Sequence, residues 1–398
     1  RFQPFAFQTS VLQVGQEERG SIELELVPSM HGALIRVMFP RGQAGGLRFA
    51  LPASDVQSWH EGSHLSMGGF TASRSTVPGG SYPDNFGMYI VVELADDEPA
   101  SWHTDHHLGV ALLMFPARET QATTRLVRVA TSFISLEQAR NSMRRELVGK
   151  SFGALLREST SAWDSLMERV QVEFSDESRA AVFYTNLYRG MLFPRFLTEE
   201  TESGELVHYS AYNGKVLPGN AVTDQGFWDA YRTVYPMLSV IFPDKLGEMV
   251  EGWVNAYKEA GWLPTWASPG QRSSMVGTMG DCSLADAIVK QKLGLVSGFN
   301  AAEAFQAILQ DAMQPPDNSA MRTDLGRSSL SEYISKGYVP SDNNAAVSNA
   351  KFQTAALSLN YHLADACVAL AADAMGERDT AERLRRRSKG FVTMFDNS

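Results

Sequence analysis

The sequence TDQGFWDAYRT spans residues 223–233, and the sequence GWLPTWASPG follows at residues 261–270. Each stretch joins an aromatic-rich segment to a predicted helix. Between them, residues 244–260 carry a wide apolar stripe with the helical period, and Gly261 stands where a helix typically ends. The two stretches are therefore predicted to be loops and helix ends of a helical domain, where indoles lie beside a carboxylate and a Gly-Pro turn.

Helical periodicity continues through the second part of the chain. Ser175 is the expected N-cap of a first helix, and Pro194 is expected to end it. The predicted helices cover residues 177–192, 224–241, 245–260, 283–293, 301–313, 345–375 and 379–395. Residues 135–174, which lack strand alternation, are predicted to form a helical linker, and residues 175–398 a helical domain.

The first part of the chain has a different period. From Ser21 to Val27 apolar and polar residues alternate with a period of two, which is typical of a strand with one face in water. Other apolar segments of strand length, separated by Gly, Pro, Asn and Asp clusters, cover residues 34–39, 88–94, 110–115 and 126–134. Residues 1–134 are therefore predicted to form an antiparallel β-sandwich, which makes the protein multidomain, with β structure followed by helices.

Composition argues against several classes of protein. The chain has 398 residues, a formal net charge of -10 and a pI of about 5.4, so nucleic acid is not an expected partner. The longest apolar runs are of strand length, so no membrane span is expected.

Cys282 and Cys367 fit no metal-ligand spacing and are expected to be two buried free thiols. The chain begins at Arg1 without a Met, so a processed or trimmed start is expected.

The sequence lacks the motifs of several hydrolytic chemistries. It has no Gly-x-Ser-x-Gly elbow, phosphate-cradling loop or His-Glu-x-x-His pair. His103, His106 and His107 form a cluster, for which a polar hairpin loop is a better explanation than a metal site. Acid-base chemistry by carboxylates is what the sequence leaves open.

The first aromatic stretch carries groups that suit a sugar ring. A helix that starts with this stretch would place on one side Gln225, Trp228, Asp229 and Arg232. A carboxylate accepts hydrogen bonds from adjacent hydroxyls, and an indole covers the apolar C–H face of a pyranose. The alternative is a core Trp beside an ion pair of Asp229 with Arg232 or Arg189, and spacing alone does not separate the two.

The second stretch places Trp262 and Trp266 on either side of a proline. A loop is an unfavourable place for indoles unless they line something. Core packing is favoured for Trp262, whereas pocket wall and core are equal alternatives for Trp266. Arg272 follows in the same loop and could bind a sugar hydroxyl or a phosphate, or pair with Asp281.

Taken together, these segments resemble the glycoside hydrolases of family 92, which are calcium-dependent exo-acting α-mannosidases. The resemblance runs through nearly the whole chain. The matching segments are FYTNLY at 183–188, GFWDAYRT at 226–233, GWLPTW at 261–266, MVG at 275–277, ADA at 285–287, GYVP at 337–340 and RSKGF at 387–391. Several segments in this order and spacing are specific, whereas one alone would be weak.

The resemblance implies an N-terminal β-sandwich and an (α/α)6 toroid, with mannose in a pocket formed partly at their interface. A closed ring takes about twelve helices, and the helices predicted here make up only about half of it. The chain is therefore expected to be part of a longer polypeptide or to be completed by a second chain. A secreted, periplasmic or cell-surface location is expected.

The resemblance also implies an inverting mechanism, in which a glutamic acid protonates the leaving oxygen, an aspartate activates water, and Ca2+ engages O2 and O3 of the sugar. Trp228 and Asp229 match the Trp-Asp pair that contacts the terminal mannose. The other substrate-binding candidates are Trp266, Arg272 and Met275. The catalytic Glu and Asp are expected beyond Ser398, and the calcium ligands stay unassigned. The predicted substrates are α-1,2-mannosides of N-glycan or mannan chains.

Two positions depart from the family pattern. Met279 stands where many members have His, and Asn360 stands where many have Glu. One alternative function is hydrolysis of a mannosyl-phosphate diester, whose leaving group needs less acid assistance and whose phosphate Arg272 would suit. The other alternative is a catalytically silent carbohydrate-binding protein on the same scaffold.

Overall fold

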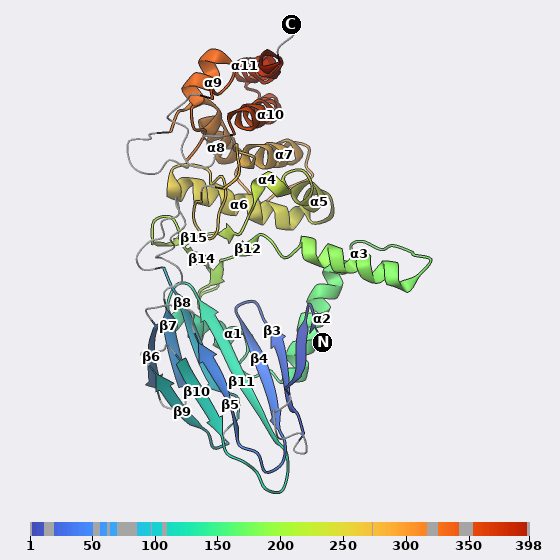
Figure 1. The fold of residues 1–398 in the computed structure, drawn as a ribbon, viewed down its shortest axis with the longest axis vertical. Coiled ribbons are helices and arrows are strands. Elements are labelled where there is room, and N and C mark those ends of the chain that lie inside the picture. Colours follow the sequence, from blue (N-terminus) through green and yellow to red (C-terminus); the bar gives the residue numbers. More distant parts are fainter. Residues whose placement is uncertain are drawn as a thin grey trace. The chain divides into compact units, whose positions relative to one another are not determined.

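The computed structural model divides the chain into two compact units (Figure 1). The first consists mainly of residues up to Tyr188 together with 199–207, and the second of 189–198 and the residues from His208 onward. The structure describes residues 2–11, 20–50, 56–61, 64–69, 86–96, 98–105, 110–272, 274–316, 325–341 and 353–395. The division at residues 134 and 174 stays a prediction.

The first unit contains two antiparallel sheets, in agreement with the alternation in the sequence. The larger sheet has the order β1 (Phe2–Gln3), β2 (Ala6–Val11), β3 (Ile22–Pro28), β4 (Gly32–Phe39), β11 (Thr123–Ser132), β8 (Met88–Leu94), β7 (His64–Gly69) and β6 (Val56–Glu61). The smaller sheet has the order β5 (Gly45–Ala50), β10 (Val110–Phe115) and β9 (Ser101–Asp105). The prediction of antiparallel sheets at the N-terminus is therefore confirmed.

The core of the first unit lies between the two sheets. Val37, Phe39 and Val92 of the larger sheet pack with Leu113 and Phe115 of the smaller one, and all of them are buried. In β10 buried residues alternate with half-buried ones, as period two requires. Burial of these side chains on facing sheets is the main stabilising term for this layer.

Two helices follow the sheets, in the stretch where helices were predicted. Helix α1 (Leu136–Glu146) starts at Ser135 and α2 (Phe152–Met167) starts at Ser151, and each serine side chain accepts a hydrogen bond from a backbone N–H of its own first turn. Met143 of α1 is buried in a second core cluster with Val27 and Leu34 of the larger sheet. The two helices therefore belong to the packing of the first unit.

The helices of the remaining chain agree in large part with the apolar periodicity. They are α3 (Glu177–Gly190), α4 (Phe227–Ala230), α5 (Val234–Ile241), α6 (Pro243–Ala260), α7 (Gly280–Lys292), α8 (Ala301–Met313), α9 (Leu330–Lys336), α10 (Thr354–Met375), α11 (Arg378–Ser388) and the 3-10 helix η3 (Lys389–Met394). Short strands precede α4, namely β12 (Arg195–Phe196), β13 (Glu199–Glu200), β14 (Leu206–Tyr209), β15 (Val216–Pro218) and β16 (Val222–Thr223).

Several helix predictions need correction. The single helix predicted over 224–241 is wrong, because Asp224 has a φ of 60° and Gln225 forms an isolated β-bridge, so that α4 begins only at Phe227. The backbone N–H groups of Ser178 and Arg179 bind the side chain of Asp176, which takes the place of the expected cap Ser175. Helix α9 was missed because it is only 7 residues long. Residues 345–352 of a predicted helix lie outside the described residues.

An aromatic cluster joins α4, α5 and α6. Trp253 of α6 is fully buried, and its ring centroid lies 4.9 Å from those of Phe227 in α4 and Tyr235 in α5. The three rings meet edge to face or at tilted angles, which are favourable geometries for aromatic pairs. This cluster fixes the short helix α4, and with it Trp228 and Asp229, on the helical core.

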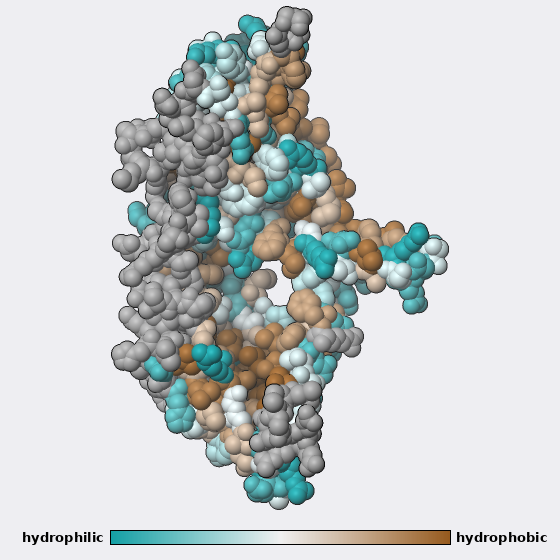
Figure 2. All heavy atoms as spheres, viewed as in Figure 1, coloured by the Kyte–Doolittle hydropathy of each residue, from teal (hydrophilic) through white to brown (hydrophobic). Residues whose placement is uncertain are grey.

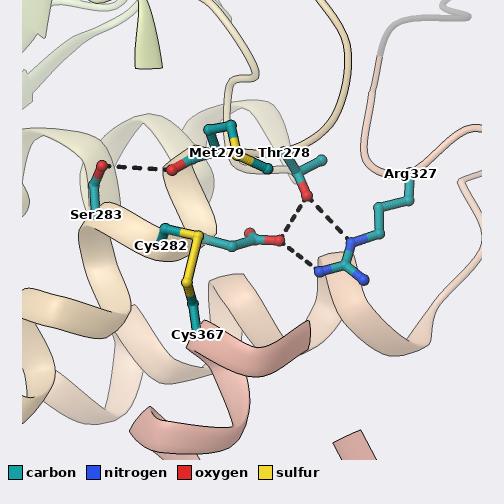
Figure 3. Close-up of a disulfide and its surroundings, with 7 residues drawn as sticks. Thr278, Met279, Cys282, Ser283, Arg327 and Cys367 are labelled. Atoms are coloured by element: carbon teal, nitrogen blue, oxygen red, sulfur yellow. Dashed lines mark hydrogen bonds and ion pairs between the residues drawn. A yellow bond between two sulfur atoms is a disulfide. The ribbon is translucent and has the colours of Figure 1, made fainter. Parts of the chain in front are cut away.

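Helices α7 and α10 are linked by a disulfide between Cys282 and Cys367 (Figure 3). The Cα atoms of the two cysteines are 5.0 Å apart, although 85 positions separate them in the sequence. The expectation of two free thiols is therefore wrong. It failed because the pairing depends on how α7 packs against α10, which the spacing of the cysteines does not reveal.

A buried ionic cluster lies beside the disulfide (Figure 3). The Arg327 guanidinium binds Asp281 of α7 at 2.8 Å and also Asp365 of α10, and all three side chains are 0% exposed. Arg387 of α11 donates to the same Asp365 carboxylate. These guanidinium groups hold the pKa of Asp365 below its usual range although burial alone would raise it.

Helix α10 satisfies the length and composition expected of a membrane-crossing segment, but 56% of its most apolar window is buried inside the protein. Tyr361 and Asp365 on its buried face bind Ser328 and Arg327. These contacts are those of a helix that packs in the core of its unit.

Candidate functional site

The two aromatic stretches of the sequence lie together in the second unit. Gln225 and Ala267 form an antiparallel bridge, and the Ala267 N–H donates to the Gln225 carbonyl at 3.4 Å. Ala267 forms a second bridge with Gln271, which folds the loop back on itself. The structure therefore brings residues 223–233 and 261–272 to one place, as a shared sugar site requires.

Gly226 and Trp266 make the closest contact between the two stretches. A Cβ atom on Gly226 would lie 2.6 Å from Cη2 of the Trp266 ring. A methyl group at that distance would displace the indole, so the absence of a side chain at 226 sets where Trp266 lies. Trp266 is half-buried, with part of its surface packed on Gly226 and part accessible.

Trp228 and Asp229 occupy the middle of α4 and differ in exposure. Trp228 is half-buried, and the Arg232 guanidinium lies over its ring, 4.9 Å from the centroid. Arg232 also donates to the Trp228 carbonyl. One face of this indole is therefore occupied by a cation, which limits Trp228 to presenting its edge or its other face to a ligand.

The carboxylate of Asp229 is exposed. Within the described part of the chain it forms no ion pair, so the alternative of a pair with Arg232 or Arg189 is not seen there. The indole Nε1 of Trp228 is buried and has no hydrogen-bond partner among the described residues. Consecutive residues of one short helix thus carry an exposed hydrogen-bond acceptor and a buried donor.

Arg272 and Met275 lie further along the second loop. The Arg272 Nε donates to the Ser268 carbonyl at 2.8 Å, so this guanidinium stabilises the conformation of the loop to which Arg272 belongs. Asp281 binds Arg327 and Thr278 instead of Arg272, which corrects the suggested pair. Met275 is 53% exposed and has a φ of 59°.

Trp262 lies apart from this contact. A Cβ atom on Gly326 would be 2.5 Å from its Cζ3, so the indole packs against Gly326. The indole is half-buried. This environment agrees with core packing, the interpretation favoured from the sequence.

Three residues that sequence reasoning did not single out organise the site. Asp224 accepts hydrogen bonds from the Ser268 hydroxyl at 2.9 Å and from Arg195. Aspartate before a turn is a weak signal, because it is common in many loops. No pattern in the sequence connects position 224 to positions 195 and 268.

The two departures from the family pattern lie next to each other. A Cβ atom on Gly277 would be 2.6 Å from Cβ of Asn360 and 3.3 Å from Cε of Met279. Asn360 donates from its side chain to the Ala356 carbonyl at 2.7 Å, and Met279 is buried. The two replacements therefore act at one point of contact between the 275–279 loop and α10.

The structure shows no group of three or more His, Cys, Asp or Glu side chains that could hold a metal ion, within the residues it describes. His103 is an exposed residue of β9, and its companions His106 and His107 lie outside the described residues. The described residues therefore contain no carboxylate-rich cluster to which Ca2+ can be assigned.

Comparison with known families gives a direct answer for most of the chain. Residues 138–398 match the Glycosyl hydrolase family 92 catalytic domain. The chain belongs to glycosyl hydrolase family 92. A search of curated proteins found no match. The match includes the residues of both aromatic stretches, so the substrate-binding candidates are part of the family 92 domain. Below, the two stretches at 223–233 and 261–272 together are called the clamp.

Solved family 92 structures have the same fold. The family 92 inverting mannosidase from Bacteroides thetaiotaomicron is 24% identical, with a TM-score of 0.77 over 98% of this chain and 55% of the mannosidase. A family 92 α-mannosidase from the same organism, in complex with mannoimidazole, is 18% identical, with a TM-score of 0.76, and the alignment covers 98% of this chain and 50% of that one. The chain therefore spans about half the length of the structures it matches.

Proposed function

We propose that this chain is the mannose-clamping half of an exo-acting, inverting α-mannosidase that cleaves α-1,2-mannosides of N-glycan or mannan chains. The observation that supports the proposal is the pairing of the GFWDAYRT loop with the Trp266 loop in a chain of family 92. The exposed Asp229 carboxylate would accept hydrogen bonds from two adjacent hydroxyls of the terminal mannose. The accessible part of Trp266 would contact the apolar C–H atoms of the ring.

The acid and the base of the reaction are proposed to lie outside residues 1–398. Inversion places the two carboxyl groups about 6.5–9.5 Å apart, so that a water molecule fits between the base and the sugar. Asp229 belongs to neither role in this proposal, because its carboxylate is assigned to binding the hydroxyls. It would orient the sugar so that the anomeric carbon faces that water.

Calcium is proposed as the cofactor of the complete site, and its ligands are proposed to come from outside the residues described here. Bound Ca2+ takes six to eight oxygen ligands, often from carboxylates. Among the described residues no group of three or more carboxylate, His or Cys side chains forms such a site, and this supports ligands from elsewhere in the complete protein.

The helical domain is proposed to be completed by further helices, either from the same polypeptide or from a second chain. Helix α10 supports this proposal because its exposed face carries large apolar side chains. Leu359, Leu363 and Leu370 are 44%, 42% and 60% exposed, while Tyr361 and Val368 on the other face are buried. In Figure 2 hydrophobic residues gather along the edge of the helical unit on the side of α7 and α10. A helix that is apolar all round is normally buried on all sides.

A secreted, periplasmic or cell-surface location is proposed as well. The disulfide between Cys282 and Cys367 supports it, because disulfides form and persist in oxidising compartments. The pair would remain as thiols in a reducing cytosol.

The proposal is tested by measuring mannose release from α-1,2-mannobiose by the natural polypeptide that contains this chain, with Ca2+ and after chelation. Asp229→Ala should reduce kcat/KM by at least about a hundredfold, because two hydrogen bonds to the sugar are lost. Asp164→Ala, which changes an exposed aspartate of α2, is the matched control and should have no effect. Unchanged kinetics in Asp229→Ala would remove this residue from the site.

The same preparation decides between the alternatives. Faster hydrolysis of a mannosyl-phosphate diester than of the mannobiose would favour the phosphodiester reaction. Calcium-independent mannose binding without any hydrolysis would favour a silent carbohydrate-binding protein.

A further inference from the structure

Asp224 connects three segments of the second unit. Its Oδ1 accepts a hydrogen bond from the Ser268 hydroxyl at 2.9 Å, and its Oδ2 accepts one from Arg195 of β12. It stands directly after β16, in which Thr223 pairs with Arg195 across the two-stranded sheet. The side chain of Asp224 is 15% exposed, so it lies under the surface between the strand pair and the 266–272 loop.

The neighbours of Asp224 support the same connection. The Thr223 hydroxyl donates to the Pro269 carbonyl at 3.1 Å, and Gln225 bridges to Ala267. Three consecutive residues therefore bind the second loop, two through side chains and one through the backbone. The residue after them is Gly226, against which the Trp266 ring packs.

The backbone at Asp224 is held in an unfavourable conformation. Among the described residues only Asp224, Met275 and Ser329 have a positive φ without being glycine, and the first two lie on the loops of the proposed clamp. Such a conformation is unfavourable for a residue with a side chain, and it persists where the surroundings enforce it. It turns the chain so that Gly226 can meet Trp266 and α4 can start at Phe227.

The ion pair itself contributes little to stability. Arg195 is 65% exposed, and a pair with so exposed a partner is largely screened by water. A residue that adopts a strained backbone and forms a weakly stabilising pair is not explained by folding energy. Of its two carboxylate contacts, the hydrogen bond from Ser268 is the one that holds the 266–272 loop.

We propose that Asp224 is a positioning residue for mannose binding, which rests on the function proposed above. Its carboxylate fixes the 266–272 loop against Gly226, so that the accessible part of Trp266 faces the same ligand as Asp229. Loss of the carboxylate frees the loop, and the sugar must then order it on binding. The expected result is weaker binding of substrate with little change in the chemical step.

Variants at position 224 separate the side chain from the backbone. Asp224→Gly removes the carboxylate and relieves the positive φ, whereas Asp224→Asn tolerates that φ and keeps an acceptor for Ser268. Ser268→Ala removes the same hydrogen bond from the other side. Asp373→Asn is the matched control, since Asp373 forms an exposed pair with Arg385 between α10 and α11, away from both loops.

The measurement is KM and kcat for mannobiose in the natural polypeptide, together with the 19F spectrum of 5-fluorotryptophan protein, in which Trp266→Phe assigns the Trp266 resonance. We expect KM to rise about tenfold in Asp224→Gly and about threefold in Asp224→Asn and Ser268→Ala, with kcat changed less than about twofold. The Trp266 resonance should move or broaden in Asp224→Gly without sugar. Asp373→Asn should match the parent in both measurements.

Two results would overturn the inference: an unchanged KM in Asp224→Gly, or an unchanged Trp266 resonance in that variant. If the parent protein neither cleaves nor binds mannosides, the proposed function fails. The fluorine spectrum then still reports whether Asp224 positions Trp266, so the two failures are distinguishable.

Discussion

Two aspartate–arginine contacts of the helical unit differ in almost every physical respect. In the Arg327 cluster Arg327, Asp281 and Asp365 are fully buried, and the cluster joins α7, α10 and α11, whereas Asp224 pairs with the mostly exposed Arg195 of β12, the strand next to β16. Removing a partner from the first leaves a charge without water or a counter-ion. Removing one from the second exposes groups that water can solvate. Loss of the first contact is therefore expected to destabilise the whole unit, whereas loss of Asp224, which also accepts the Ser268 hydrogen bond, is expected to change how residue 224 meets the 266–272 loop.

Replacing Arg327 should produce the largest loss of stability. Arg327→Leu leaves Asp281 buried without its guanidinium partner, and Asp365 keeps Arg387 and the hydrogen bond from the Tyr333 hydroxyl. The free energy of unfolding should fall by about 3–5 kcal/mol, as measured by urea denaturation. Arg195→Gln in the same assay should cost less than about 1 kcal/mol. Equal losses of unfolding free energy in the two variants would show that the two contacts contribute equally to stability, contrary to this prediction.

The disulfide beside the buried cluster should give the next largest effect. Cys282→Ala/Cys367→Ala removes a cross-link that closes a segment of 85 residues between α7 and α10. Its removal should lower the free energy of unfolding by about 2–5 kcal/mol, chiefly because the unfolded chain gains freedom. Dithiothreitol should lower the stability of the parent by a similar amount and leave the double variant unaffected. Two titratable thiols in the native protein, without reductant, would contradict the structure.

Much of the fold follows from residue periodicity. Alternation in β10 and the stripe of α6 identified a strand and a helix, because burial on one face imposes each pattern. The break at Asp224 did not follow, since its φ is enforced by Ser268 and Arg195, which are distant in the sequence. A local sequence pattern cannot predict features that depend on contacts between segments far apart in the sequence.

The candidate site shows the same limit on a smaller scale. The composition of the two aromatic stretches indicated a sugar site, and the bridge of Gln225 to Ala267 places them together. The sequence did not reveal that Arg232 covers one face of Trp228, or that Trp266 packs on Gly226. Residue types predict which chemistry is available, whereas the accessible face of each ring depends on its neighbours.

Asp311 of α8 is buried and interacts with Asp281 of the buried cluster, so the pH dependence of stability also tests this cluster. Burial raises the pKa of Asp311 in α8 well above the usual range, and the negative charge of Asp281 raises it further. A carboxyl whose pKa is raised by folding contributes its stability fully below the unfolded-state pKa of about 3.9, and this contribution is lost as the pH rises through the folded-state pKa. The contribution of the Asp311 carboxyl to the free energy of unfolding of the parent protein should therefore decrease as the pH rises.

Asp311→Asn keeps the shape of the side chain but cannot ionise. Between the unfolded-state and the folded-state pKa of Asp311, the free energy of unfolding of the variant, relative to that of the parent, should increase by up to about 1.4 kcal/mol for each pH unit. Urea titrations between pH 5 and pH 9 measure the difference, with Asp373→Asn at the exposed pair as a control that should run parallel to the parent. Parallel curves for Asp311→Asn as well would mean that Asp311 is already ionised in the folded protein. The buried cluster would then tolerate an unbalanced charge, and burial would no longer distinguish it from the Asp224 contact.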